Sequence, residues 1–140
     1  GIANTTPSAA LIAHFTNSTA EQVTGRGSGI DDETYARKVE IVTNLIAKTK
    51  NENDPIKTLA QIGGIEIAAL VGYMLRAASL QVPVVLDGVI TLAAATIAKA
   101  INPEINQFLI ACNNFIYTKF RYWFVYFNIV NFCNRVYAIM

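Results

Sequence analysis

The chain has 140 residues, of which 53% are hydrophobic and 15% are charged. This length allows one domain with a buried core, and the composition excludes extensive disorder. The formal net charge of +1 gives no sign of the basic surface that nucleic-acid binding requires. No nucleic-acid partner is therefore predicted.

The two cysteines, Cys112 and Cys133, have no metal-binding or redox spacing. We expect free thiols in the cytoplasm and no metal site. The chain opens with Gly1 rather than methionine, and no charged segment is followed there by an apolar one. No signal peptide is predicted, and we expect a fragment that lacks its N-terminal part.

Two short helices are predicted first. Thr6, followed by proline, predicts a helix over residues 7–15. The only histidine, His14, lies near the end of this helix and is expected to cap it or to lie at the surface rather than to bind a ligand. Residues 18–21 have capping-box spacing and predict another one or two helical turns.

Residues 24–33 (TGRGSGIDDE) hold three glycines in five positions and lead into a third helix. Asp31 or Asp32 is expected to cap that helix, which continues to about Lys50. Glycine permits positive φ and leaves room for a ligand to approach the backbone. Backbone N–H groups ahead of a helix bind anions. The stretch is therefore predicted to bind a phosphate.

Arg37 and Lys38 lie near the start of the third helix, where the helix dipole favours acids. Either they are a solvated basic pair, or one of them points at an anion held by the glycines; the charge pattern leaves both open. The glycine spacing is not the dinucleotide fingerprint, and no Gly-Lys-Ser/Thr follows it. No cofactor is therefore predicted.

The second half of the chain predicts an α/β arrangement. A helix starts at Asp54-Pro55 and ends at Gly63-Gly64, and a long apolar helix follows to about residue 80. Residues 82–86 predict a strand covered on both faces, with Asp87-Gly88 at its carboxyl end, where α/β sheets bind ligands. A helix over 89–101 and a strand over 108–111 complete a right-handed βαβ unit.

Residues 113–140 differ from the rest. Ten of the 14 aromatic residues lie between Phe115 and Tyr137, and no acidic residue follows Glu104. We expect a divergent tail, produced by a change of reading frame or by a cut through the domain. The alternative is a membrane-associated segment, but residues 122–132 are too few for a spanning helix of about 20 residues.

The ordered motifs resemble a known family. They are residues 1–6 (GIANTT), residues 25–32 (GRGSGIDD), Arg37-Lys38, Gly63-Gly64 and residues 84–88 (VVLDG). Together they are similar to nicotinate-nucleotide–dimethylbenzimidazole phosphoribosyltransferases over residues 1 to about 112. The third residue of the first motif is usually glycine in this family and is Ala3 here, which matters if its φ is positive.

The resemblance implies an α/β fold: a Rossmann-like three-layer domain with a parallel sheet, here truncated at both ends. Residues 1–112 would be a partial phosphoribosyltransferase domain. The family forms homodimers in the cytoplasm. It transfers phosphoribose from nicotinate mononucleotide to 5,6-dimethylbenzimidazole, giving α-ribazole 5′-phosphate and nicotinate in cobalamin biosynthesis.

The resemblance also implies the residues of the site. The phosphate and ribose would be held by Gly1, Asn4, Thr5, Gly25, Gly27, Lys38, Asp87 and Gly88. The family's general base, a glutamate in a Gly-Glu-Gly-Thr-Gly-like motif, has no counterpart in the sequence, and Cys112-Asn113-Asn114 replaces a Ser-His segment. No catalytic residue is assigned, and the chain alone is predicted to be inactive or nearly so.

Three interpretations stay open. The chain is either a transferase fragment or a non-catalytic remnant that binds a phosphate ligand or a partner chain. A small membrane-associated protein is the third interpretation, and it depends on the aromatic tail.

Overall fold

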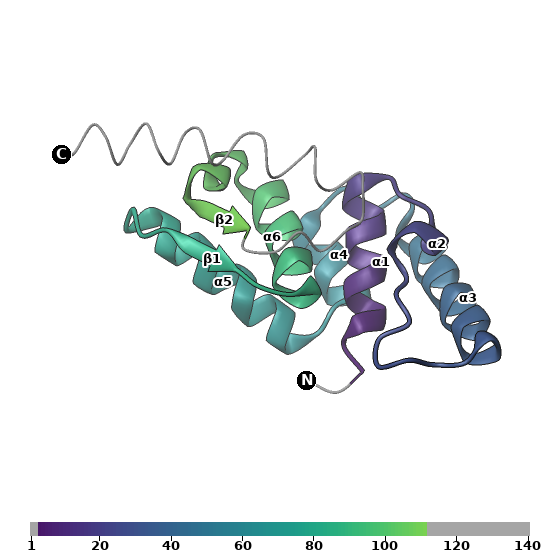
Figure 1. The fold of residues 1–140 in the computed structure, drawn as a ribbon. Helices are drawn as coiled ribbons and strands as arrows, with labels where there is room; N and C mark the ends of the chain where they lie inside the picture. Colours follow the sequence, from purple (N-terminus) through teal and green to yellow (C-terminus); the bar gives the residue numbers. More distant parts are fainter. Residues whose placement is uncertain (1–2, 112–140) are drawn as a thin grey trace.

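The computed structural model describes residues 3–111, which form six α-helices, one 3-10 helix and two strands (Figure 1). In chain order these are α1 (Thr5–Thr16), α2 (Ala20–Val23), α3 (Asp32–Thr49), α4 (Pro55–Ile62), α5 (Ile65–Ser79), β1 (Val84–Leu86), α6 (Val89–Ile101), η1 (Pro103–Phe108) and β2 (Leu109–Ala111). Gly1, both cysteines and the tail over residues 113–140 lie outside the described residues, so the predictions for them stay predictions.

The two strands confirm the α/β class. They pair in parallel, with Val84 opposite Leu109 and Leu86 opposite Ala111, and α6 forms the connection between them. Parallel pairing requires such a crossover, which the predicted strand–helix–strand order supplied. Most of the described chain is nevertheless helical, since each strand has only three residues.

The first strand begins later than predicted because the preceding helix ends in a Schellman motif. Gln81 takes the left-handed conformation (φ 59°), and its N–H and that of Val82 return to the carbonyls of Ala78 and Ala77 at 2.9 Å each. Val82 therefore still belongs to the helix end. The prediction that the strand is covered on both faces is wrong for the described residues, since Leu86 is buried but Val85 is 60% exposed.

The core is centred on two helices of small residues. Six consecutive positions are buried in α1, residues 8–13, and six in α6, residues 93–98. A helix buried around its whole circumference needs neighbours on every side. Accordingly, α1 packs against α6, α3, α2 and α4, while α6 also packs against α5 and η1. The two run side by side in the same direction, each with its N-terminus at its lower end in Figure 1.

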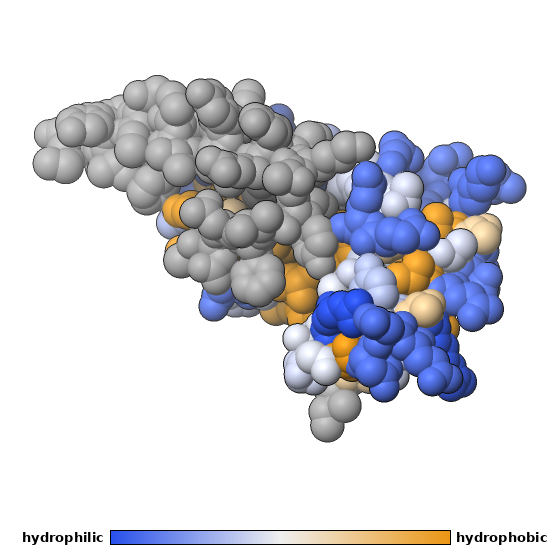
Figure 2. Space-filling model, turned by 45° about the vertical axis from the view of Figure 1, so that its right-hand side comes forward, coloured by the Kyte–Doolittle hydropathy of each residue, from blue (hydrophilic) through white to orange (hydrophobic). Residues whose placement is uncertain are grey.

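Helix α3 covers one side of α1 and faces solvent with its other side. Val42 is fully buried, while Val39 and Ile46 pack partly against the core, so the helix turns one apolar face inward. Hydrophilic residues gather on the right-hand side in Figure 2, the side on which Figure 1 places α3. Within residues 3–111, no helix combines the length and apolar character needed to cross a membrane.

Candidate phosphate-binding site

The first helix begins at Thr5, two residues earlier than predicted, with Asn4 as its N-cap. Pro7 is consequently the third helical residue rather than the first. This position is tolerated because the first N–H groups of a helix have no intrahelical acceptor, so proline loses nothing there. Asn4 makes no side-chain cap hydrogen bond. The N–H groups of Asn4, Thr5 and Thr6 therefore remain free of helical partners at the positive end of α1.

Lys38, on α3, reaches this helix start. Its Nζ donates to the Oγ1 of Thr5 and to the carbonyl oxygen of Gly25, both at 3.1 Å. Three residues that the family resemblance implied for one site, far apart in the chain, are thus joined through Lys38. We call Lys38, Thr5 and Gly25 the Lys38 cluster. Arg37, the other member of the basic pair, is exposed on α3.

The charge of Lys38 is only partly compensated. An ammonium group has three donors, and the Lys38 cluster uses two of them on neutral oxygens. Burial lowers the pKa of Lys38 below its ordinary value, because desolvation disfavours the charged form. An anion beside the third donor would stabilise the charge again. The cluster is therefore suited to an anionic ligand.

Two of the three glycines of the loop take the positive φ that glycine permits. Gly27 and Gly29 both have positive φ, +57° and +98°. The N–H groups of Gly29 and Ile30 donate to the carbonyl of Arg26 and are therefore used within the turn. Within the described residues, no such bond uses the N–H of Gly25 or Gly27, the two groups that we predicted to face a phosphate.

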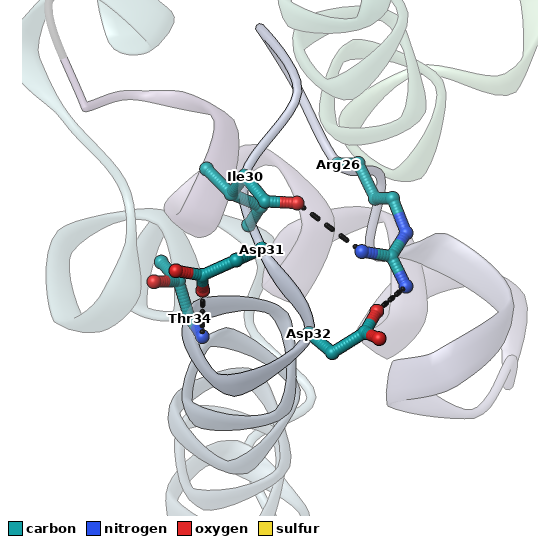
Figure 3. A network of polar contacts seen from close by, with 5 residues as sticks. All are labelled: Arg26, Ile30, Asp31, Asp32 and Thr34. Carbon is teal, nitrogen blue, oxygen red and sulfur yellow. Dashed lines mark hydrogen bonds and ion pairs between the residues drawn. The ribbon is translucent and has the colours of Figure 1, made fainter.

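Arg26 is a member of this loop that the sequence analysis did not single out. Its Nη1 donates to the carbonyl of Ile30 at 3.1 Å, and its Nη2 pairs with Oδ1 of Asp32 at 2.5 Å (Figure 3). The guanidinium also lies over the ring of Tyr35, 4.7 Å from its centroid. The available signal was an arginine followed by an acid six residues later and an aromatic nine residues later, which is too general to predict a contact.

Asp87 and Gly88 follow β1 directly, as predicted, and lead into α6. Gly88 has φ +85° and ψ 164°, a conformation essentially restricted to glycine. As the N-cap of α6, it supplies no side-chain hydrogen bond. Thr91 Oγ1 instead donates to the carbonyls of Asp87 and Gly88 at 2.7 and 2.9 Å. The two residues lie at the head of α6, beside α1, rather than in the Lys38 cluster.

The backbone is strained at Ala3, near the start of the first motif. Ala3 has φ +65°, a left-handed conformation that glycine adopts more readily than alanine. The condition under which alanine matters at this position is therefore met. Among residues 3–111, no group of three histidine, cysteine or acidic side chains is arranged to hold a metal ion.

Comparisons with known proteins identify the family. Residues 1–116 match the family model described as phosphoribosyltransferase. The chain is 47% identical over 112 residues to the nicotinate-nucleotide–dimethylbenzimidazole phosphoribosyltransferase of Salinispora tropica, covering 79% of this chain and 31% of that protein. It is 40% identical over 123 residues to the enzyme of the same name from Geotalea uraniireducens, covering 87% of this chain and 35% of that protein.

A solved structure agrees with these relatives. The crystal structure of CobT from Thermus thermophilus superposes with a TM-score of 0.76 at 36% identity, over 79% of this chain and 33% of that one. The chain thus spans about a third of the length of the proteins that it matches. It belongs to the nicotinate-nucleotide–dimethylbenzimidazole phosphoribosyltransferase family.

Proposed function

We propose that the Lys38 cluster binds the phosphate of nicotinate mononucleotide, within an enzyme that transfers phosphoribose to 5,6-dimethylbenzimidazole. The observation that carries this proposal is the position of Lys38 Nζ, 3.1 Å from both Thr5 Oγ1 and the Gly25 carbonyl. A cation stands there at the uncapped N-terminus of α1. Both the ammonium charge and the helix dipole favour a phosphate at that point.

The phosphate grip would serve the reaction by fixing the ribose. Displacement at the anomeric carbon passes through an oxocarbenium-like state, so the sugar must be held while the base nitrogen attacks. Anchoring the phosphate at α1 would direct the ribose towards the head of α6, where Asp87 and Gly88 lie. Held geometry of this kind lowers the barrier by removing translational and rotational freedom before the reaction. The products are α-ribazole 5′-phosphate and nicotinate.

Binding of the nucleotide and its catalytic turnover depend on different residues. A general base typically contributes about 10²–10⁴-fold to a rate, and the family's glutamate motif has no counterpart in the sequence. We therefore propose that the chain binds the nucleotide and turns it over slowly or not at all. The location proposed is the cytoplasm, because a charged nucleotide does not enter a membrane unaided.

The test is a titration with nicotinate mononucleotide, followed by calorimetry, on the wild-type chain, Lys38→Ala and Arg37→Ala. Arg37 is the matched control, since it is the exposed neighbour of Lys38 with the same charge. Loss of a hydrogen bond to a charged group corresponds to roughly tenfold or more in affinity. We expect that loss for Lys38→Ala and little change for Arg37→Ala. Equal weakening in both variants would reduce the site to general surface charge, and an absence of binding in the wild type would refute it.

A homodimer is the second part of the proposal, and α5 offers the surface. One side of α5 is buried in the core through Ile67, Val71 and Met74. The other side, which we call the α5 outer face, is exposed along its whole length although much of it is apolar. It consists of Ile65, Glu66, Ala69, Gly72, Tyr73 and Arg76.

The charged residues and the small glycine of the α5 outer face suit packing against the same face of a second copy of the chain. If two copies of α5 packed antiparallel, Glu66 of each would oppose Arg76 of the other, with Gly72 near the centre. A glycine inside a helix costs about 1 kcal/mol relative to alanine. No atom of the described structure approaches a Cβ built on Gly72 within 4 Å, so the core does not require this glycine. A close helix–helix approach would require it.

Light scattering after size-exclusion chromatography tests the dimer. Gly72→Arg should leave the monomer folded, since it has open space and gains helix propensity, yet it should abolish the dimer. Glu66→Arg and Arg76→Glu should each weaken association, and the double exchange should restore it. Lys57→Glu, on the exposed side of α4, is the control. A monomeric wild type, or dimers unchanged in all variants, would refute this interface.

A further inference from the structure

Arg26 makes contacts at every level of the glycine loop. Its carbonyl accepts the N–H groups of Gly29 and Ile30 at 3.1 and 3.2 Å. Its guanidinium returns to the carbonyl of Ile30 and to Asp32, the first residue of α3. The guanidinium face covers Tyr35, one turn further along the same helix. Main chain and side chain of this one residue thus tie the beginning of the loop to its end.

These contacts compensate for the flexibility of the glycines. Gly27 and Gly29 lie between the two tied points, and glycine loses more conformational freedom on ordering than any other residue. Without a cross-link, the loop would have to be ordered when a ligand binds, which weakens binding. Each contact is exposed and individually weak, since the side chains of Arg26 and Asp32 are 50% and 92% exposed. Their common effect is to hold one loop geometry.

The loop conformation that Arg26 holds also positions Gly25. Gly25 directly precedes Arg26, and its carbonyl is one of the two acceptors that hold Lys38 Nζ. The guanidinium itself is taken by Ile30 and Asp32 on the far side of the turn (Figure 3). Arg26 can therefore influence Lys38 through the backbone, without a contact to the ligand.

We propose that Arg26 is a positioning residue for the phosphate grip, which it preorganises by fixing the Gly25 carbonyl against Lys38. This inference rests on the proposed function of the Lys38 cluster and adds a role that Lys38 alone does not explain. Lysine would be a poor substitute for Arg26. The planar guanidinium donates to two acceptors and stacks on Tyr35 at once, whereas an ammonium group is a point charge without a stacking face.

The experiment measures binding of inorganic phosphate and of nicotinate mononucleotide to the wild type, Arg26→Ala, Arg26→Lys and Asp32→Asn. Arg37→Ala, which removes one positive charge from the same exposed region, is the control. Surface pairs of this kind correspond to at most about fivefold each in affinity. We expect several-fold weaker binding for Arg26→Ala, a smaller loss for Asp32→Asn, partial rescue in Arg26→Lys, and little change for Arg37→Ala.

The second readout is the pKa of Lys38, followed by NMR of the lysine side chains without ligand. If Arg26 acts through Gly25, its loss loosens the loop, hydrates Lys38 and moves that pKa back towards its ordinary value. A purely structural effect would lower thermal stability while leaving that pKa in place. If Arg26→Ala binds both ligands as tightly as the wild type does, the role of Arg26 is overturned and the proposed function stands. Wild-type chains that bind neither ligand overturn the proposed function instead.

Discussion

Lys38 and Thr5 are joined by a 3.1 Å hydrogen bond although 33 residues separate them. The contact links the second turn of the solvent-facing helix α3 to the first residue of the central helix α1. Lys38 Nζ also holds the Gly25 carbonyl, so three segments converge on one ammonium group. Because burial lowers the pKa of that group, Lys38 loses its charge at a lower pH than an ordinary lysine does.

Phosphate binding should therefore weaken at alkaline pH. The charged form of Lys38 binds the anion, and its pKa in the free protein lies below the ordinary lysine value of about 10.4. Affinity should be constant near neutrality and fall as pH rises through the lowered pKa, before ordinary lysines titrate. Titrations of nicotinate mononucleotide at increasing pH measure this. In Lys38→Arg, whose side chain stays charged, the decline should be absent; an identical decline there would remove Lys38 as its cause.

Ala3→Gly should stabilise the protein. Ala3 has φ +65°, and a side chain in the left-handed region costs roughly 1–2 kcal/mol. Glycine removes that strain but increases the entropy of the unfolded chain, which offsets part of the gain. We expect about 1 kcal/mol more stability in denaturant titrations. A destabilised Ala3→Gly variant would indicate that the methyl group of Ala3 makes contacts that outweigh the strain.

Gly88→Ala should have the opposite effect. The backbone of Gly88 lies at φ +85° and ψ 164°, where any side chain is strained by about 1–3 kcal/mol. Space is not the obstacle, since no atom lies within 4 Å of a Cβ built there. Thermal unfolding should show a loss within that range. Thr91→Ala, which removes the hydroxyl bound to the Asp87 and Gly88 carbonyls, is the comparison and should cost less.

Local signals predicted the helices well because caps and breaks are encoded within a few residues. Asp31 caps α3 and Asp54 caps α4, each accepting backbone N–H groups as its position in the sequence indicated. The capping box of α2 is displaced by one residue, to Thr19 and Gln22. Three consecutive polar residues there, from Asn17 to Thr19, offer alternative caps of similar strength.

Features that depend on contacts between distant parts of the chain were not predicted from the sequence. Pro7 suggested a helix start at its own position, but α1 begins two residues earlier, at Thr5. The exposure of Val85 depends on which neighbours the sheet has, information that a run of β-branched residues does not contain. The spacing of the site residues in the sequence did not predict that Lys38 lies near the glycine loop. Only the family resemblance implied it. Charge pattern alone left Arg37 and Lys38 equivalent, and the orientation of α3 distinguishes them.

His14 and Thr49 form a second contact between α1 and α3, at the end opposite to the site. His14 Nδ1 lies 3.1 Å from Thr49 Oγ1. The single hydroxyl proton of fully buried Thr49 faces the carbonyls of Leu45 and Ile46. The direction of the His14–Thr49 hydrogen bond follows the tautomer of the imidazole, since Nδ1 donates when it carries the proton and accepts when it does not. The prediction that His14 caps its helix or lies at the surface missed this inter-helix contact.

This contact predicts a loss of stability in mild acid. Burial lowers the pKa of His14 below 6.5, and this effect outweighs the opposing influence of Glu52. Since the folded state binds the proton less readily than the unfolded state, stability is full above pH 6.5, falls as pH decreases, and levels off below the folded-state pKa. Asparagine can retain a hydrogen-bonding group near the position of Nδ1 but does not titrate, so His14→Asn should flatten this part of the curve. Urea unfolding between pH 7 and 5, above the range where carboxylates titrate, measures both proteins. Parallel curves would assign the acid sensitivity to other groups.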